Sequence, residues 1–586
     1  MRQWMVAAKK ADFYAIAEKF HVDPVVARII RNREVIGEKN IRIYLGGNLS
    51  DLSDPHQMKD MDRLVEILAQ KIRKQVRIRI IGDYDVDGVT SSHLFLTALR
   101  RVGAKVDVVI PHRIQDGYGL SLHLLQQAKE DGVDTILTCD NGIAAIDEIA
   151  WAKAQKMTVL VTDHHAVPFE EHEGRRTEKK SLADAVVNPH QQDCGYPYKE
   201  LCGAGVAWNV IRVLYENYDM DKREAEDLLD FVAMATVCDV MSLSGENRIL
   251  VKEGLKRIRH TKNIGLQALM QACNVQPENI SAYHFGYVLG PCVNATGRLD
   301  TARHALRLFE TGQETEAEEI ARDLVDLNQE RKELTLQGVE MAKKLCEEGG
   351  YENDPVLVLF LPDVHESIAG LIAGRIREMY NRPVFVLTRG EEGVKGSGRS
   401  TENYSMYENM CGCAELFTKF GGHPMAAGLS LPEENVEKFR RKINENCPLT
   451  VEEVCPDIHI DMAMPVGYAS TELVHQFALL EPFGKDNPSP LFADRNLSIS
   501  RMWVIGKNRN VLRMSVLSEY GQPVPVIFFG DVETLFAYFT EKFGQKEVEN
   551  ALHGRKNRIL FSMVYTAKID FYQGNENLQL EMKYYR

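Results

Sequence analysis

The chain has 586 residues, more than one hydrophobic core supports, so three or four domains are expected. Its formal net charge of −14 excludes a uniformly basic surface, although local basic patches remain compatible with a nucleic-acid partner. The sequence has neither an apolar run long enough to cross a bilayer nor a signal peptide, and its eleven cysteines are scattered. We therefore expect a soluble cytoplasmic protein with reduced thiols and no contact with a membrane.

Residues 1–59 predict a helical lead-in, and the apolar run 76–81 then predicts a buried strand. Asp83, Asp85 and Asp87 follow that strand at alternate positions. Three carboxylates so close together repel one another and raise each other's pKa unless a cation or hydrogen-bond donors hold them. This segment therefore predicts a metal site.

Two more apolar runs end in the same way further along the chain. Residues 133–138 precede Asp140 in an Asp-Asn-Gly sequence, and residues 157–162 precede the Asp-His-His sequence 163–165. Helix-like segments separate the runs, which predicts β-α-β units and a parallel sheet. Because functional groups gather at the carboxyl ends of parallel strands, the three motifs should meet at one edge. A single Asp-Asn-Gly indicates a turn, but three such ends together indicate a functional site.

The ligand types narrow the metal and the reaction. Carboxylates dominate, one or two imidazoles join them, and no cysteine pair has the spacing of a structural zinc site. This set suits Mn²⁺, Mg²⁺ or Fe²⁺. Several aspartates and a histidine are enough for two ions about 3.5–4 Å apart, which clamp the attacking and leaving oxygens of a phosphoryl transfer. Phosphoester hydrolysis is the expected reaction class.

A strand over residues 105–110 should open onto the same edge. In the segment that follows it, Arg113 is suited to a phosphate and Tyr118 to a base or a sugar, while a turn anchored by the tyrosine is the alternative. Further on, residues 231–240 predict a helix that brings Asp239 into the site.

The next regions predict a second lobe. Residues 302–348 have few glycines and no proline, which predicts a long helix between two lobes. Residues 356–361 and 384–387 predict strands separated by a helix over 367–380, giving a smaller α/β domain. The Gly-Ser-Gly-Arg-Ser sequence at 396–400 offers backbone N–H groups, hydroxyls and a guanidinium, a combination suited to a phosphate.

From about residue 455, short strand-like runs alternate with turns, which predicts a small β barrel. Lys507, Arg509 and Arg513 lie near Trp503 in this region. Bases stack on aromatic rings while cations follow the backbone, so these four residues indicate an oligonucleotide-binding barrel. A charged hairpin with a core tryptophan is the alternative.

These motifs resemble those of a known family. Four of them look like the signature motifs of the DHH phosphoesterases: Asp85-x-Asp87-Gly88, Asp140-Asn141-Gly142, Asp163-His164-His165, and Asp239 within residues 236–241. Four longer motifs are similar to the RecJ branch, the bacterial single-strand-specific 5′ to 3′ exonucleases: residues 289–299, 396–400, 421–428 and 480–488. The similarity covers nearly the whole chain.

The resemblance implies two divalent cations, Mn²⁺ or Mg²⁺. The implied ligands are Asp85, Asp87, Asp140, His164 and Asp239, with Asp140 as the bridging carboxylate. Some relatives carry a ligand histidine where this chain has Ile81, and Asp83 is the expected substitute. His165 should face the scissile phosphate. Asp163 should orient the imidazole of His164 by a hydrogen bond, without binding the metal itself.

The resemblance also implies a substrate cleft between the lobes. Ser397 and Arg399 are expected to hold a terminal 5′ phosphate, with Arg298 and Asn294 approaching from the lobe junction. His423, in a glycine-walled turn, is expected to line this cleft, and a packed histidine in a tight turn is the alternative. The chain departs from many relatives at Cys292, where they carry an arginine, so the family's phosphate contact is not expected there.

The expected architecture is α/β with five regions. These are a helical lead-in (1–59), a parallel-sheet DHH catalytic domain (60–265), an interlobe segment with a connecting helix (266–348), a smaller DHHA1 domain (349–454), and a C-terminal OB-fold barrel (455–586).

The expected function is a metal-dependent exonuclease that removes nucleotides from the 5′ end of single-stranded DNA in repair and recombination. We expect a monomer that works with a single-strand-binding protein and a helicase. One alternative is the same chemistry on short oligoribonucleotides or cyclic dinucleotides, whose hydrolases usually stop after the second domain. Another is an inactive single-strand-binding scaffold, which would have lost aspartates or His164, yet all are present.

Overall fold

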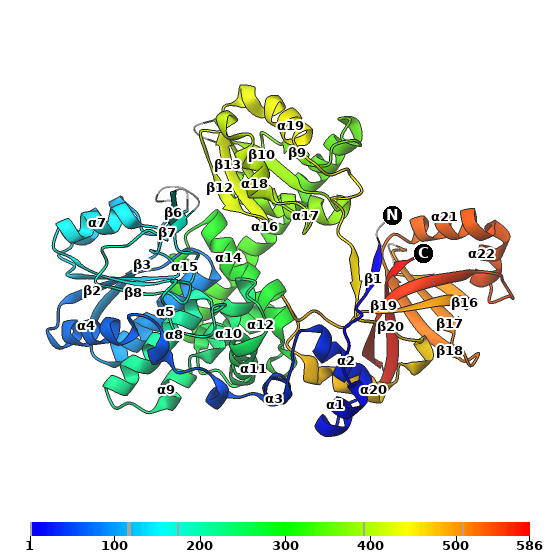
Figure 1. Cartoon of the computed structure of the whole chain (residues 1–586), viewed down its shortest axis with the longest axis horizontal. Helices are drawn as coiled ribbons and strands as arrows, with labels where there is room; N and C mark the ends of the chain where they lie inside the picture. The colour runs from blue at the N-terminus through cyan, green and yellow to red at the C-terminus, as the bar shows by residue number, and fades with distance from the viewer. Residues whose placement is uncertain are drawn as a thin grey trace. The chain divides into compact units, whose positions relative to one another are not determined.

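The computed structural model describes residues 3–113, 116, 119–172, 175–390, 393–506, 509–572 and 574–586. The chain divides into two compact units (Figure 1). Residues 48–456 form the first unit, and residues 3–47 join residues 457–586 in the second. The expected lead-in over residues 1–59 is therefore split, because its first part folds with the carboxyl-terminal segment. No helix among the described residues is long and apolar enough to span a membrane.

A five-stranded sheet with only parallel pairings organises the larger lobe of the first unit, as the sequence predicts. Its strands, in spatial order, are β3 (Lys105–Val109), β2 (Arg77–Ile81), β4 (Thr135–Cys139), β5 (Thr158–Thr162) and β8 (Ala185–Val187). The three acidic motifs follow β2, β4 and β5, so they share the carboxyl edge. A short hairpin of β6 (Phe169–His172) and β7 (Arg175–Glu178), which the sequence analysis did not predict, lies between β5 and β8 in the chain.

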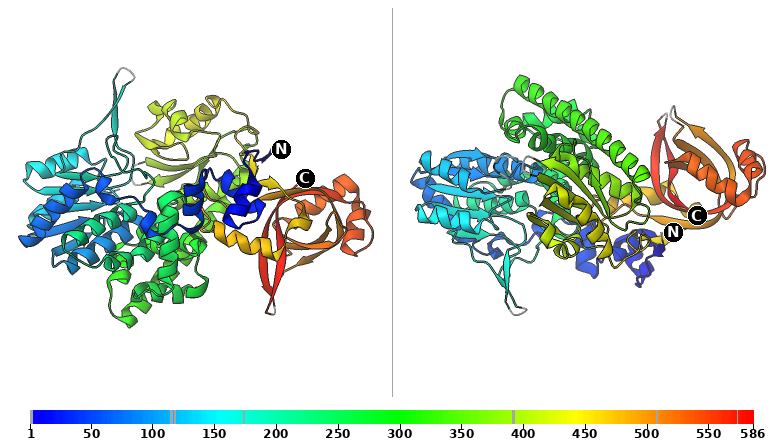
Figure 2. Two further views of the ribbon diagram at one scale, coloured as in Figure 1. Left: turned by 60° about the horizontal axis from the view of Figure 1, so that its bottom comes forward. Right: turned by 90° about the horizontal axis from the view of Figure 1, so that it is seen from above.

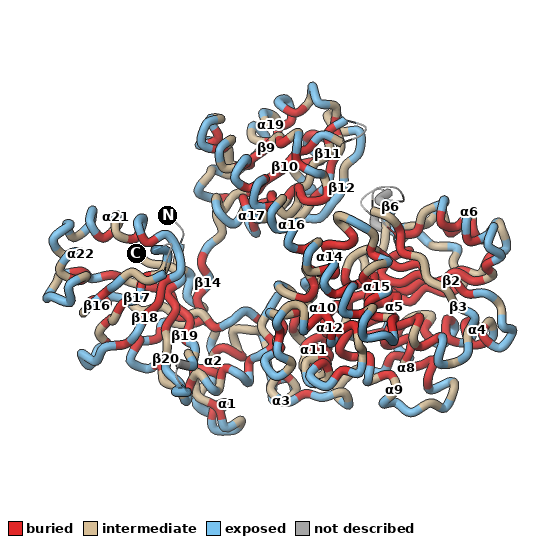
Figure 3. The backbone as a smooth tube through the Cα atoms, turned by 180° about the vertical axis from the view of Figure 1, so that it is seen from behind, coloured by how far each residue is buried: buried red, intermediate tan, exposed pale blue. Residues whose placement is uncertain are grey.

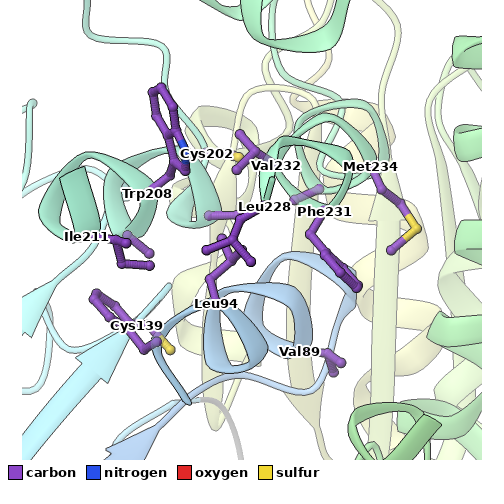
Figure 4. Close-up of a cluster of buried hydrophobic side chains, with 14 of the residues drawn as sticks. Val89, Leu94, Cys139, Cys202, Trp208, Ile211, Leu228, Phe231, Val232 and Met234 are labelled. Atoms are coloured by element: carbon purple, nitrogen blue, oxygen red, sulfur yellow. The ribbon is translucent and has the colours of Figure 1, made fainter. Parts of the chain in front are cut away.

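Helices cover both faces of this sheet. Ile78 and Ile80 pack into one core with α4 (Met61–Arg73), α5 (Val86–Arg101), α8 (Gly203–Asn217) and α10 (Leu229–Cys238). Ile81 lies in the opposite core with α6 (Leu122–Glu130) and α7 (Ile146–Ala154). The first core is the larger and contains Leu94, Trp208 and Phe231 (Figure 4). The strands other than β3 are largely buried, the state that is red in Figure 3. Each such side chain contributes about 1.5–3 kcal/mol when buried, which makes the sheet edge a rigid base for the motifs.

Helices continue the larger lobe and lead to the smaller one. They are α9 (Lys222–Glu226), α11 (Gly245–Ile258), α12 (Ile264–Ala272), α13 (Ala282–His284), the π-helical turn η4 (Phe285–Leu289), α14 (Gly290–Leu299), α15 (Arg303–Glu310) and α16 (Glu314–Glu348). The single helix expected over residues 302–348 is instead two helices, because the chain leaves helical geometry at Thr311. The 35-residue helix α16 is green in Figure 2.

The smaller lobe is built on a mixed five-stranded sheet. Its strands, in spatial order, are β12 (Lys419–His423), β13 (Ala426–Leu431), β11 (Gly393–Arg399), β10 (Val384–Gly390) and β9 (Leu357–Phe360). Helices α17 (Ala369–Tyr380), α18 (Met406–Cys411) and α19 (Val436–Glu445) belong to the same lobe. The phosphate-type motif at residues 396–400 lies mainly on strand β11. Its glycines allow close packing, since a Cβ on Gly398 would lie 2.4 Å from the sulfur of Met406.

A closed barrel forms most of the second unit, as predicted. The strands β16 (Phe492–Ile505), β17 (Val511–Leu517), β18 (Pro523–Phe529), β20 (Asn575–Tyr585) and β19 (Leu560–Tyr572) pair in that order, and β16 also pairs with β19. The short elements β14 (Ile458–Ile460), β15 (Met462–Ala463) and α20 (Thr471–Gln476) lead into it, and α21 (Val532–Phe543) and α22 (Gln545–Leu552) connect β18 to β19.

The amino-terminal helices α1 (Phe13–Phe20), α2 (Pro24–Asn32) and α3 (Glu38–Gly46) share the barrel's hydrophobic core. Strand β1 (Trp4–Val6) pairs with β14. Arg33 makes a buried ion pair with Asp461 at 2.6 Å, and the Tyr44 hydroxyl donates to Oδ1 of Asn487 at 2.8 Å. The motif at residues 480–488 therefore joins these helices to the barrel, and it lies in the unit that lacks the acidic motifs.

Candidate metal centre and phosphate cleft

The first acidic motif occupies the turn between β2 and α5. Asp85 caps the helix, and its Oδ1 accepts a hydrogen bond from the N–H of Gly88 at 3.0 Å. A Cβ on Gly88 would lie 2.5 Å from the backbone nitrogen and oxygen of Asp83, so only glycine allows this close return of the chain. The turn thereby brings Asp83 and Asp85 to the carboxyl edge of the sheet.

Asp87 is fixed by the amino terminus of α8. Its two carboxylate oxygens accept hydrogen bonds from the N–H groups of Gly203 at 2.6 Å and Ala204 at 2.7 Å. A Cβ on Gly203 would lie 2.6 Å from the Cβ of Asp140, so this helix start is packed directly against the site. Sequence analysis missed this element, although the Gly-Ala-Gly sequence at 203–205 is a signal for close backbone approach.

The imidazole of His164 connects the acidic residues from different elements. Its Nε2 lies 3.1 Å from Oδ1 of Asp140, 3.6 Å from Oδ2 of Asp239 and 3.7 Å from Oδ2 of Asp87. Asp239 reaches this position as the residue that caps the end of α10, as the predicted helix over 231–240 required. Four separate segments of the chain therefore converge on one nitrogen.

Three overlapping groups of side chains have ligand atoms spaced as in a metal site, with all ligand atoms of a group within 4.8 Å of one another. Asp87, His164 and Asp239 form the first group, and Asp83, Asp85 and Asp140 form the second. The third consists of Asp140, His164 and His165 and overlaps the other two. Asp83 thus lies where its carboxylate can bind a metal ion. This position agrees with the expectation that Asp83 replaces the ligand histidine that some relatives carry at the position of Ile81. Asp140 belongs to the second group and lies beside His164 of the first, which is the placement a bridging carboxylate needs.

The electrostatics of these carboxylates fit bound cations. Burial and the negative charge of Asp85 hold the pKa of Asp83 well above its usual range. Burial, with the charges of Asp87 and Asp85, does the same to the pKa of Asp140. The buried Oδ1 of Asp83 and Nε2 of His164 have no hydrogen-bond partner within the described part of the chain, so these atoms are available to a metal ion. Carboxylates and one imidazole suit Mn²⁺ or Mg²⁺.

The carboxylate of Asp163 forms a hydrogen bond with a different histidine ring from the one expected. Its Oδ1 accepts hydrogen bonds from Nδ1 of His165 at 2.8 Å and from the backbone N–H of His164 at 2.7 Å. Its Oδ2 accepts from the N–H of Ile143 at 2.9 Å. The carboxylate therefore orients the ring of His165, and it fixes only the backbone of His164. The sequence Asp-His-His does not reveal which of the two histidine rings forms a hydrogen bond with the aspartate.

Helix α14 supports the acidic turn from the other side. Oδ1 of Asn294 accepts a hydrogen bond from the N–H of Val86 at 3.1 Å. A Cβ on Gly297 would lie 2.4 Å from the carbonyl oxygen of Tyr84, so the helix touches the turn that carries Asp83 and Asp85. Asn294, expected among the substrate contacts, is engaged in this turn through its amide oxygen.

A cavity of about 450 Å³ lies beside Tyr84, the residue that precedes Asp85. Arg113 lines it, and Arg298 and Arg399 form hydrogen bonds with the lining residues Ser367 and Ser397, so we call it the arginine-lined cavity. It is lined by Tyr84 and Arg113 from the larger lobe and by Ser397 and Lys395 from the smaller lobe. The guanidinium of Arg113 stacks 5.1 Å from the ring centre of Tyr84, which precedes Asp85 directly. Arg113 from the larger lobe and Lys395 from the smaller lobe therefore meet at this cavity, where Lys395 pairs with Glu366 at 2.8 Å.

Arg298 and Arg399 add charge to this cavity. An Nη of Arg298 donates to the carbonyl oxygen of Ser367 at 2.8 Å, and an Nη of Arg399 donates to that of Gly398 at 2.7 Å. Burial and the charges of Arg113, Arg331 and Arg399 lower the pKa of Arg298 to about 10. Burial and the charge of Arg113 lower the pKa of Arg399 as well. No carboxylate of the described residues forms an ion pair with either arginine, so an anion would relieve their mutual repulsion.

Three other predicted positions have different outcomes. His423 is the last residue of β12, directly before the turn to β13, and is exposed, so the alternative of a packed histidine is wrong and its place in the cleft stays a prediction. Cys292 is buried, with its sulfur 3.3 Å from the carbonyl oxygen of Val288, and is part of the core rather than of the cleft. Tyr118 lies outside the described residues.

The predicted nucleic-acid surface of the barrel is partly described. Trp503 on β16 is 37% exposed and pairs across the sheet with Arg513 on β17. The guanidinium of Arg501 lies 5.7 Å from the ring centre of Trp503, and Arg509 is exposed just before the next strand. Lys507 lies outside the described residues. An aromatic face and cations therefore share one surface of the barrel.

The fold and the site define a metal-dependent phosphoesterase with two lobes and an attached barrel. Three family models match the chain: the DHH family, N-terminal domain (residues 77–236), the DHHA1 domain (353–447) and the RecJ OB domain (460–584). Each matched segment lies within the corresponding expected region.

Relatives and solved structures identify the branch. The single-stranded-DNA-specific exonuclease RecJ of Haemophilus influenzae is 32% identical over 582 residues, covering 96% of each chain. RecJ of Bacillus subtilis is 33% identical over 512 residues, which cover 87% of this chain and 63% of that protein. The crystal structure of RecJ from Thermus thermophilus in complex with Mn²⁺ has a TM-score of 0.81 and 25% identity, covering all of this chain and 79% of that one. The chain belongs to the RecJ family.

Proposed function

We infer that this chain is a metal-dependent exonuclease that hydrolyses the phosphodiester bonds of single-stranded DNA. The observation that carries this inference is the pairing of two carboxylate-rich ligand groups with an arginine-lined cavity in one unit. Carboxylates that hold cations and arginines that hold anions are the two components that phosphoryl transfer requires. Membership of the RecJ family, whose named members are specific for single-stranded DNA, supports the substrate class.

The two ligand groups would each hold one divalent cation, with Asp140 between them. When bound, the cations supply an activated water and neutralise the charge that develops on the phosphate oxygens. The amino terminus of α8 keeps both oxygens of Asp87 in place through two N–H donors. The Asp85 cap and the Asn294 contact hold the turn in one geometry, so the ligands need little reorganisation.

His165 is suited to contact the scissile phosphate. Burial alone would lower the pKa of His165, yet its hydrogen bond to Asp163 and the charges of Asp163 and Asp239 raise it to about 9. The ring therefore carries a proton at neutral pH in the metal-free protein. Since Asp163 binds Nδ1 of His165, Nε2 is the ring nitrogen that would donate to a phosphate oxygen.

We propose that the arginine-lined cavity reads the 5′ end of the strand. A terminal phosphate carries more charge than an internal diester and exists only at the end. Arg399 offers a planar fork for bidentate contact, with the Ser397 hydroxyl beside it and Arg298 and Arg113 close enough to act on it electrostatically. Selection of that end gives hydrolysis a 5′ to 3′ direction.

The barrel is the second binding element for DNA in this proposal. Trp503 offers a face for a base, and Arg513 and Arg509 offer charge for the backbone. We further propose that the enzyme acts as a monomer in the cytoplasm, in repair and recombination, on strands prepared by a helicase and covered by a single-strand-binding protein. A complete barrel and a full ligand set favour this reading over a short-oligonucleotide hydrolase or an inactive scaffold.

The proposal is tested by digestion of matched DNA and RNA strands, single and duplex, with Mn²⁺, with Mg²⁺ or with a chelator. We expect mononucleotide release from single-stranded DNA with either ion and none with the chelator. Comparable rates on duplex DNA, or faster release from RNA than from DNA, would contradict the proposed substrate.

A further inference from the structure

Two tyrosines are exposed on the segment that precedes α14. Tyr283 is 62% exposed and Tyr287 is 71% exposed, and their rings stack with centroids 5.0 Å apart at an interplanar angle of 26°. They lie four positions apart on α13 and η4, whereas Phe285 and Leu289 of the same segment are buried. One side of this segment packs into the core while the other presents two flat rings to solvent.

This segment packs directly against the end of α10. The Cys238 sulfur lies 3.3 Å from the carbonyl oxygen of Phe285. A Cβ on Gly290 would lie 2.3 Å from the same sulfur, so no side chain separates the two elements. The metal-ligand candidate Asp239 follows Cys238 directly, and the next residue, Val240, is 62% exposed. The segment that carries the aromatic pair therefore packs against the helix end that precedes Asp239.

Folding alone does not explain the exposure of these rings. An aromatic pair four residues apart adds a little helix stability, but burial of the rings would stabilise the fold far more. A π-helical turn such as η4 is uncommon and is frequently found at functional sites. Exposed aromatic faces beside a phosphate-handling centre match the way single strands are held, because every base has a face that stacks on a ring.

We propose that Tyr283 and Tyr287 form a stacking platform for bases of the single strand whose backbone lies at the metal centre. This proposal rests on the proposed exonuclease function and adds the subsite that holds the bases. Stacking on a ring is indifferent to base identity, so the platform suits an enzyme that must process any sequence. Paired bases are already stacked inside a duplex, so the platform also favours an unpaired strand.

The first test compares Tyr283→Ala and Tyr287→Ala with the corresponding phenylalanine variants in the full-length protein. Each alanine variant should raise KM for a single-stranded oligonucleotide by about fivefold or more, with kcat within about twofold of wild type. The phenylalanine variants should keep a KM within about twofold of wild type, since the ring face remains. Tyr14→Ala, at an exposed tyrosine of the other unit, should change neither constant. Thermal unfolding of each variant verifies that it is folded.

The second test distinguishes stacking from a structural role. Strands with a single abasic nucleotide, placed in turn at each position near the 5′ end, are compared on wild type and on the Tyr283→Ala, Tyr287→Ala double variant. One or two positions should raise the wild-type KM about fivefold and leave that of the double variant unchanged. Equal effects on both proteins at every position, or phenylalanine variants as impaired as alanine variants, would overturn the platform. If wild type fails to cut the intact strand, the proposed nuclease function is wrong, and fluorescence anisotropy with the same strands still tests the platform.

Discussion

The carboxylate edge of the larger lobe and the arginine-lined cavity lie in the same unit but concentrate opposite charges. At the edge, Asp83 and Asp140 are buried with raised pKa values, so cations are needed to keep them ionised. Beside the cavity, Arg298 and Arg399 are half-buried with lowered pKa values, so an anion would stabilise their charges. In the proposed function a nucleic-acid strand would satisfy both regions, with its phosphates at the cations of one and at the guanidinium groups of the other.

The comparison shows why net charge is a poor guide to the partner. The chain carries a formal charge of −14, yet the acidic residues of the metal centre fit bound cations, and Arg113, Lys395 and Lys419 line one cavity. Local charge decides what each region binds. Substitutions in the two regions should therefore have separate effects. Loss of a carboxylate at the edge should abolish hydrolysis, and loss of an arginine at the cavity should abolish selection of the 5′ end.

The largest effect is expected at the edge. Asp140→Ala removes the carboxylate placed between the two ligand groups, and hydrolysis of single-stranded DNA should fall more than about 100-fold, beyond the loss typical for residues that only support ligands. Binding of the strand, followed by fluorescence anisotropy, should change much less. Asp193→Ala, which removes an exposed aspartate paired with Lys59, is the matched control and should keep wild-type rates. Normal turnover by Asp140→Ala would remove this residue from the mechanism.

The cavity should give an intermediate and more selective effect. Arg399→Ala should reduce the preference for 5′-phosphorylated over 5′-hydroxyl DNA by about 10-fold or more, since a hydrogen bond to a charged group contributes about 1.5–3 kcal/mol. Arg399→Lys should restore only part of the preference, because the planar fork is absent.

Initial rates on the two substrates measure this preference. Arg375→Ala, at an exposed arginine of α17 paired with Glu378, is the control and should leave it intact. If Arg399→Ala retains the full preference, end recognition lies elsewhere, and Arg298 and Arg113 become the next positions to vary.

A smaller effect is expected at the barrel. Trp503→Ala should weaken binding of long single strands about fivefold or more, and Arg513→Ala should lower the salt dependence of log K by about 0.7. Cleavage at saturating DNA should remain near wild type for both, because neither residue belongs to the ligand groups or to the unit that carries them. Affinity measured by anisotropy across a salt series checks both variants, and unchanged affinity would assign the barrel another role.

Deletion of the barrel needs a matching deletion at the amino terminus. Residues 457–586 share a hydrophobic core with α1 to α3, and the buried pair of Arg33 and Asp461 spans the two segments. Removing only the carboxyl-terminal segment would expose that core to solvent and leave Arg33 without its partner. Residues 48–456 are therefore the fragment to compare with the full chain.

The subtlest prediction concerns the titration of His165. In the metal-free protein its pKa is about 9, because the hydrogen bond and the charge of Asp163 outweigh the effect of burial. Asp163→Asn removes that charge, so the pKa of His165 should fall and the ring should lose its proton at a lower pH. Proton NMR titration of the imidazole measures the shift. A pKa that stays near 9 in the variant would mean that other carboxylates protonate the ring.

Sequence patterns predicted those parts of the site that follow from side-chain type and from the position of the strand ends. Alternating aspartates after apolar runs located the parallel sheet and its acidic edge, and the helix ending at Asp239 was found as predicted. The patterns failed where long-range packing decides. Gly203 holds Asp87 from a helix start more than a hundred residues away, and local periodicity contains no information about that contact. The ring partner of Asp163 likewise depends on a side-chain rotamer that the sequence does not specify.

Strands β9 and β10 of the smaller lobe were found as predicted, whereas β11, β12 and β13 and the split of the lead-in were missed for physical reasons of the same kind. Residues 396–400 and 421–423 are rich in glycine, which is disfavoured in strands, but they pair with β13 from both sides and pack closely. Helices α1 to α3 were predicted as helices, but their apolar faces do not reveal which core they enter.

The most direct test of the account is the order in which nucleotides leave a single strand labelled at one end or the other. Single-stranded DNA with a 5′ phosphate is incubated with Mn²⁺, and release of the 5′-terminal and 3′-terminal labels is followed from the first turnovers. We expect the 5′ label to appear at once as a mononucleotide and the 3′ label to follow only after the strand has been consumed, and a chelator should stop both. Immediate release of the 3′ label, or hydrolysis that continues in the chelator, would contradict this expectation.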